Sequence, residues 1–142
     1  MELKTKTKQV IVVRRDLKMK HGKMASQVAH AAMSFLTREG RVGWQADMLN
    51  DVFMNDDDSI DKHNGAIRDW LANSFAKVVL GVDSEEELRE IEEKAVENGI
   101  MAHLVVDNGR TVFNNIPTPT CLALGPDWNE NLDELVGHLK LY

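Results

Sequence analysis

Hydrophobic residues occur in short continuous runs that alternate with longer stretches in which they recur every three or four positions. The runs occupy residues 9–13, 76–82, 102–106 and 120–124 and are rich in aliphatic residues. Runs of this length and composition are typical of strands that are buried on both faces. The pattern therefore predicts four strands, with the first one central in the sheet.

Helical spacing fills the segments between these runs. A first helix is predicted from near Lys23 to about Arg38, because apolar residues repeat there at intervals of three and four. The same kind of pattern predicts further helices over 61–75 and 129–138, and a short helix within 42–53 that is followed by a turn at 55–59.

One helix carries clear signals at both ends. Ser84 followed by Glu87 is a capping-box pattern, and Gly99 marks the helix end.

Because strands alternate with helices, the sequence predicts an α/β fold, a three-layer α/β/α sandwich around a four-stranded mixed sheet. A chain of 142 residues is expected to form a single domain over 1–142. Gly125-Pro126 is expected to turn the chain after the fourth strand.

Composition narrows the class of protein. Cys121 is the only cysteine, so no intramolecular disulfide can form, and its apolar neighbours indicate a buried thiol. No apolar run is long enough to span a bilayer. We therefore expect a cytoplasmic protein that has no membrane partner.

Charge is distributed unevenly along the chain. Residues 1–23 contain eight lysines and arginines and two acidic residues, a net charge of +6, whereas the whole chain carries −6. A basic end on an acidic body can steer a polyanion to one face. The basic side chains nearest the first helix are candidate phosphate contacts, namely Arg14, Arg15, Lys18 and Lys20.

Two groups of polar residues are candidates for chemistry. Lys23, Gln27 and His30 are spaced by four and three, so they project from one face of the first helix. A lysine at a helix start does not stabilise the helix, because the free N–H groups there already carry partial positive charge. The position of this lysine therefore indicates an anion-binding site.

The second group, Asp107, Arg110 and Thr111, follows the third strand, and ligand sites of open α/β sheets gather at strand ends. Each residue has an alternative interpretation. Asp107 could bond the backbone of the Asn108-Gly109 turn, His30 could be a core histidine, and Arg110 could pair with a surface carboxylate.

The sequence lacks several motifs that mark common classes of enzymes and metal sites. It contains no Gly-x-Ser-x-Gly elbow, no P-loop, and no metal-ligand spacing among its five histidines and Cys121. The segment Asp56–Asp61 resembles a calcium loop only superficially, because its spacing does not fit, and we interpret it as a solvated acidic loop.

Four short motifs follow one another along the chain. They are Gln9–Met19 with Gly22-Lys23, Ala25, Gln27 and His30-Ala31; Asp107-x-Gly109-Arg110-Thr111; Thr120-x-Leu122-x-Leu124-Gly125-Pro126; and Gly137–Tyr142. In this order they resemble one family, the type-2 peptidyl-tRNA hydrolases of archaea and eukaryotes. They cover nearly the whole chain outside about 40–65, which we interpret as an acidic insertion.

The resemblance implies a cofactor-free esterase that cleaves the bond between a stalled peptide and the 3′ ribose of tRNA. It implies that peptidyl-tRNA is the partner, and it is compatible with a homodimer. The residues that it assigns to the site are Lys23, His30, Asp107, Thr111 and Thr120, with Gln27 beside them. Charge and position add candidate substrate contacts, namely Arg110, Arg14, Arg15, Lys18 and Lys20.

Our mechanistic hypothesis makes Asp107 the base that orients the water, either directly or through His30. Lys23 and a threonine hydroxyl would stabilise the oxyanion or the departing ribose oxygen. Two alternatives remain open at this point: a catalytically weak module that binds tRNA or a protein, and an esterase for another acyl adduct.

Overall fold

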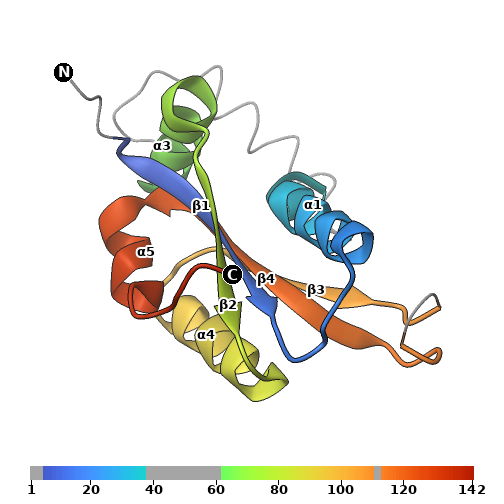
Figure 1. Ribbon diagram of the computed structural model, residues 1–142. Coiled ribbons are helices and arrows are strands. Elements are labelled where there is room, and N and C mark those ends of the chain that lie inside the picture. Colours follow the sequence, from blue (N-terminus) through green and yellow to red (C-terminus); the bar gives the residue numbers. More distant parts are fainter. Residues whose placement is uncertain (1–4, 38–61, 111–112) are drawn as a thin grey trace.

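The computed structural model describes residues 5–37, 62–110 and 113–142 (Figure 1). The helix predicted within 42–53, the turn predicted at 55–59 and Thr111 lie outside these residues, as does most of the predicted acidic insertion.

A four-stranded mixed sheet forms the centre of the molecule, in the order β2-β1-β4-β3. The central strand β1 runs parallel to β2 and antiparallel to β4, and β3 is antiparallel to β4. The prediction of four strands in a mixed sheet is therefore confirmed. The strands are β1 (Thr7–Arg14), β2 (Lys77–Val82), β3 (Ala102–Asp107) and β4 (Thr118–Trp128).

The expected turn at Gly125-Pro126 is wrong. β4 continues through both residues to Trp128, because its far end still pairs with the start of β1, where Lys8 lies opposite Asp127. The register shifts between Lys8 and Val10, and Gly125 has a φ of 81°. Glycine adopts this left-handed backbone without a side-chain clash, so the strand passes an irregularity instead of ending there.

Helices cover both faces of the sheet, as predicted for a three-layer sandwich. Figure 1 shows α1 and α3 on one face and α4 and α5 on the other. The helix predicted over 61–75 is α3 followed by a short π-helical segment at Trp70–Ser74. The helices are α1 (His21–Thr37), α3 (Lys62–Asp69), α4 (Glu85–Glu97) and α5 (Asn129–Val136).

The core is divided by the sheet into two layers, because successive residues of a strand face opposite sides. Val10 and Val12 pack toward α4 and α5, whereas Ile11 and Val13 pack toward α1, and all four side chains are fully buried. The continuous apolar run thus marks a central strand, as the sequence predicts.

Local signals set the ends of α4. The Ser84 hydroxyl accepts a hydrogen bond from the Glu87 N–H at 3.1 Å, which confirms the predicted N-cap. The Glu87 carboxylate accepts one from the Asp83 N–H at 3.4 Å. The helix ends at Glu97, two residues before Gly99.

The C-terminal residues lie along the outer edge of β2 (Figure 1). The Tyr142 N–H donates to the Val79 carbonyl at 3.1 Å, and Leu141 forms an antiparallel bridge with Leu80. The chain's own end therefore extends the sheet beyond β2.

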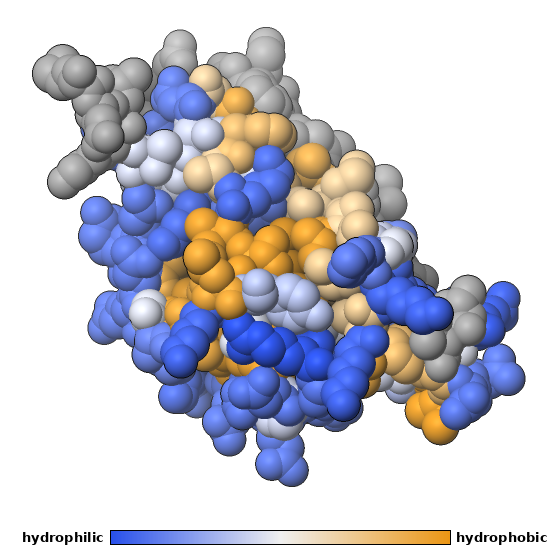
Figure 2. Space-filling model, viewed as in Figure 1, coloured by the Kyte–Doolittle hydropathy of each residue, from blue (hydrophilic) through white to orange (hydrophobic). Residues whose placement is uncertain are grey.

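The surface that is seen from the viewpoint of Figure 1 is hydrophobic in its middle, and hydrophilic residues lie around this region (Figure 2).

Candidate active site

A polar cluster lies where the first turns of α1 meet the end of β3. The Lys23 ammonium donates to Asp107 Oδ1 at 2.8 Å, and the Gln27 amide donates to the same oxygen at 3.2 Å. The Lys23 and Asp107 side chains are only 16% and 11% exposed, so this ion pair is largely shielded from solvent. The structure thus brings together residues that lie about eighty positions apart in the sequence.

The turn after β3 fixes the other side of the carboxylate. Asp107 Oδ2 accepts a hydrogen bond from the Gly109 N–H at 2.9 Å. Gly109 has a φ of 82°, and a side chain at this position would collide with the backbone of Ile116. Asp107 therefore performs the turn chemistry expected of an aspartate before Asn-Gly and also faces the helix.

These contacts determine the charge of Asp107. The hydrogen bond from Lys23 is the largest cause that lowers the pKa of Asp107 below its ordinary value, with further lowering from the Gly109 N–H and Gln27. Partial burial opposes this shift but does not overcome it. The carboxylate is consequently ionised at neutral pH and is available as a hydrogen-bond acceptor.

A buried hydrogen bond holds Gln27 in one orientation. The Thr120 hydroxyl donates to Gln27 Oε1 at 2.6 Å, and this turns the amide nitrogen toward Asp107. Gln27 is 2% exposed and Thr120 is fully buried. A flipped amide would place its oxygen against the carboxylate, so Thr120 fixes the donor that Asp107 receives.

Comparison with known proteins identifies the family. The chain matches the family described as "Peptidyl-tRNA hydrolase PTH2" over residues 7–142. The chain belongs to this family.

Curated relatives named peptidyl-tRNA hydrolase agree with this assignment. The chain is 38% identical to the protein of Nanoarchaeum equitans over 135 residues, which covers 95% of this chain and 98% of the relative. Identity to the protein of Methanopyrus kandleri is also 38%, over 94% of this chain and 97% of the relative. The protein of Aeropyrum pernix is 38% identical over 95% of both chains.

Within this PTH2 domain, the remaining predicted site residues differ in burial and in their contacts. Thr120 belongs to the cluster, but its buried hydroxyl acts through Gln27, so we regard it as a positioning residue and not as one that contacts substrate. His30 is exposed, one turn along α1 from Gln27. Among the described residues, the Asp107 carboxylate accepts hydrogen bonds from Lys23, Gln27 and the Gly109 N–H, and the route through His30 stays a prediction.

Two of the arginines predicted to contact phosphate have partners within the chain. Arg14 is 9% exposed, pairs with Asp16 at 2.6 Å, and donates to the Pro119 carbonyl at 3.0 Å. Arg15 donates to the Leu141 carbonyl at 2.7 Å. These contacts give both guanidinium groups a structural role.

The other basic residues predicted to contact substrate are more accessible. Lys18, Lys20 and Arg110 are exposed, and they remain candidates for contacting substrate. The Arg110 backbone N–H also donates to Asn108 Oδ1 at 2.9 Å, which forms part of the turn after β3.

Sequence reasoning missed one neighbour of the site. The Lys23 ammonium lies 5.7 Å from the centre of the Phe113 ring, within range of a cation–π contact. A single aromatic residue in a polar loop gives no periodic signal, so only its distance from Lys23 places it here.

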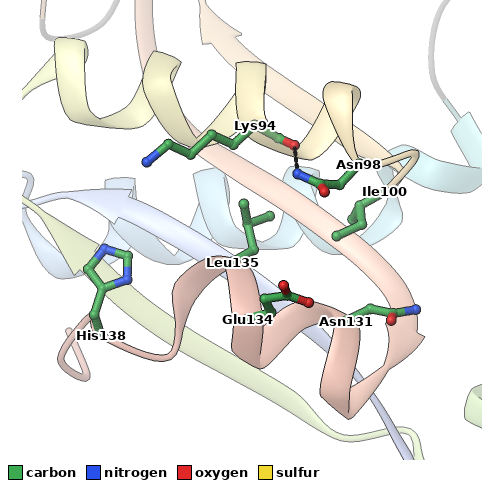
Figure 3. Close-up of a pocket in the computed structure, with 7 residues that line it drawn as sticks. All are labelled: Lys94, Asn98, Ile100, Asn131, Glu134, Leu135 and His138. Atoms are coloured by element: carbon green, nitrogen blue, oxygen red, sulfur yellow. Dashed lines mark hydrogen bonds between the residues drawn. The ribbon is translucent and has the colours of Figure 1, made fainter.

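A groove lies on the opposite side of the sheet, between α4 and α5 (Figure 3). This groove has a volume of about 550 Å³ and contains no residue that the sequence assigns to the site. Its lining consists of Lys94, Asn98, Ile100, Asn131, Glu134, Leu135 and His138. The candidate active site therefore remains the cluster around Asp107.

Within the described residues, no helix is both long and apolar enough to cross a membrane.

Proposed function

We propose that this protein hydrolyses the ester bond between a peptidyl, or other N-blocked aminoacyl, group and the 3′ ribose of tRNA. Membership of the PTH2 family supports the reaction class. The observation that carries the proposal in this chain is the shielded pair of Lys23 and Asp107 at 2.8 Å. In the reaction, the water oxygen bonds to the ester carbonyl carbon, and the bond from that carbon to the ribose oxygen breaks. A proton passes to the ribose oxygen, so the products are the peptide acid and tRNA with a free 3′ hydroxyl.

The contacts support a division of roles within the cluster. Asp107 is ionised, so it accepts a hydrogen bond from the attacking water and orients it toward the ester. Lys23 carries the positive charge that the developing oxyanion or the departing ribose oxygen requires. Gln27 holds Asp107 in place, and Thr120 holds Gln27. Thr111 and His30 stay predicted members of the site.

The decisive assay compares an N-blocked aminoacyl-tRNA with its unblocked counterpart and follows release of free tRNA. Selective release from the blocked substrate is the expected result. Binding of tRNA without release would instead favour a catalytically weak binding module. Equal release from both substrates would favour a general acyl-tRNA esterase.

Replacing Thr120 with valine should lower kcat by about tenfold, because it removes the hydroxyl that fixes the Gln27 amide and leaves a buried oxygen without its donor. Thr120→Ser keeps the hydroxyl and should retain kcat to within about twofold. Steady-state kinetics of the two variants, with their unfolding curves as a control, tests this. Equal loss in both variants would show that the shape of the side chain matters and its hydrogen bond does not.

Binding of tRNA should depend on salt through Lys18 and Lys20, which are exposed near the start of α1. Replacing both with alanine should reduce the slope of log K against log salt by about two, roughly one for each phosphate that is no longer neutralised. Lys94→Ala, on the opposite side of the sheet, is the matched control and should leave the slope unchanged. Titration of tRNA at several salt concentrations measures this, and an unaltered slope in the double variant would exclude these contacts.

Two expectations from the sequence accompany this function as proposals. We place the protein in the cytoplasm, where translation supplies peptidyl-tRNA, and we propose that it forms a homodimer. Sedimentation of the purified chain would test the second of these.

A further inference from the structure

β3 is an edge strand of the sheet. One of its sides pairs with β4, and within the described part of the chain no strand lies beyond it (Figure 1). The opposite edge differs, because the C-terminal residues lie along β2 there. The outer edge of a sheet presents backbone donors and acceptors that another extended segment can bind.

The ladder between β3 and β4 determines which backbone groups point outward. The Gly125 N–H donates to the Met101 carbonyl at 2.9 Å, and the Val105 carbonyl lies 3.4 Å from the Thr120 hydroxyl on β4. Residues 101 and 105 therefore direct their backbone groups toward β4. The register shifts between Val105 and Val106, but the extra residue, Thr120, lies on β4. The alternation along β3 therefore continues, and the N–H and C=O groups of Leu104 and Val106 face the outer edge.

This outer edge leads directly to the candidate active site. Val106 precedes Asp107, whose carboxylate is bound by Lys23, and the Val106 side chain is 51% exposed. Strand residues advance about 3.3 Å each, so Leu104 lies roughly 10 Å behind Asp107 along the strand. A segment paired with this edge would therefore deliver its end to the reacting groups.

We propose that the outer edge of β3 binds the peptide part of the substrate as an added strand, through the backbone groups of Leu104 and Val106. This inference rests on the proposed hydrolysis of peptidyl-tRNA. β3 runs toward Asp107, and the ester is at the carboxyl end of the peptide, so the peptide runs parallel to β3. Pairing of this kind reads only backbone, which suits a substrate whose amino-acid sequence varies.

Parallel pairing makes a specific demand on the substrate. One edge residue of β3 bonds two peptide residues that are two positions apart, and the residue between them directs its N–H away. The hydrogen bonds to Leu104 and Val106 therefore involve three alternate peptide residues, which span five positions along the peptide. Alternate peptide N–H groups take part, and the others do not.

The test uses the full chain and tRNA that carries N-acetylated oligo-alanyl groups of one to about six residues. We expect kcat/KM to rise up to about five residues and then to level off, by about 3- to 10-fold for each hydrogen bond gained. N-methylation of single residues within the pentapeptide should lower kcat/KM by a similar factor at alternate positions only. The unaffected positions control for the conformational effect of the methyl group.

Val106→Pro provides the corresponding change in the enzyme, because it removes the outward N–H at an edge position where proline is tolerated. It should reduce the advantage of the pentapeptidyl over the N-acetyl-alanyl substrate. Val106→Ala is the matched variant that shortens the side chain and retains the N–H, and it should retain that advantage. Since the readout is a ratio of two substrates, a general loss of folded enzyme does not alter it.

The outcomes are distinguishable. Hydrolysis of every substrate with neither length dependence nor an alternating effect of methylation would overturn binding at the β3 edge and leave the proposed reaction intact. No hydrolysis of any N-blocked substrate would overturn the proposed reaction and this inference with it.

Discussion

Replacing Asp107 with asparagine is expected to lower kcat by about 100-fold or more, as loss of a catalytic group does. Asparagine has nearly the same shape and can still accept the hydrogen bond from the Gly109 N–H. It lacks the negative charge that pairs with Lys23 and that orients the attacking water. The substitution therefore separates the charge of this side chain from its role in the turn.

Turnover of N-blocked aminoacyl-tRNA by the purified variant measures this effect. Asp83→Asn, which removes an exposed carboxylate after β2, is the matched control and should behave like the unmodified protein. Circular dichroism establishes whether the Asp107 variant is folded. Near-normal kcat in a folded Asp107→Asn protein would remove Asp107 from the catalytic machinery.

Replacing Lys23 with methionine is the second change with a large expected effect, again about 100-fold or more in kcat. Methionine retains most of the length and apolar character of the side chain and removes the ammonium group. The reaction then lacks the positive charge that stabilises the oxyanion, and Asp107 loses the partner that lies 2.8 Å away. Lys94→Met, on α4, is the matched control.

For the Lys23→Met variant we also expect a change in how activity depends on pH. Lys23 is the largest cause of the lowered pKa of Asp107, so its removal should raise that pKa toward the ordinary value. In the unmodified protein the carboxylate is ionised down to a pH below 3.8, whereas in the variant it should become protonated at a higher pH. The acid limb of the residual activity should thus move upward, and an unchanged limb would mean that Asp107 does not control it.

The lowered pKa of Asp107 also makes the free energy of unfolding depend on pH. The pKa of Asp107 is lower in the folded than in the unfolded chain, so the carboxylate stabilises the fold above the ordinary value of 3.8. That contribution is lost as the pH falls through the lower, folded value. Denaturant unfolding of the unmodified protein and of Lys23→Met should therefore differ most above pH 4 and converge in stronger acid.

The sequence predicts those parts of the fold that depend on local patterns. Continuous apolar runs locate the four strands, and the spacing of Lys23 and Gln27 places both side chains on one face of α1. Their convergence with Asp107 follows from two general rules, that helix starts attract anions and that ligands bind at strand ends. The role of His30 stays a prediction, because spacing along a helix does not determine which way an exposed imidazole points.

The roles that the sequence does not predict depend on contacts between residues that lie far apart in the chain. Charge alone suggests that Arg14 and Arg15 bind phosphate, yet their acceptors include the Pro119 and Leu141 carbonyls, more than a hundred positions away. A motif assigns Thr120 to the site but does not distinguish contact with substrate from support of Gln27. Burial decides this, and burial depends on the packing of β4 against α1.

The two outer strands of the sheet differ in what lies beside them, and this difference affects how copies of the molecule can pair edge to edge. At one margin the strand is already covered by the chain's own last residues, which include Leu141 and Tyr142. Within the described residues, the outer side of β3 is the margin at which a whole strand can take on a foreign backbone. Two copies that meet there through identical margins would form a two-fold pair.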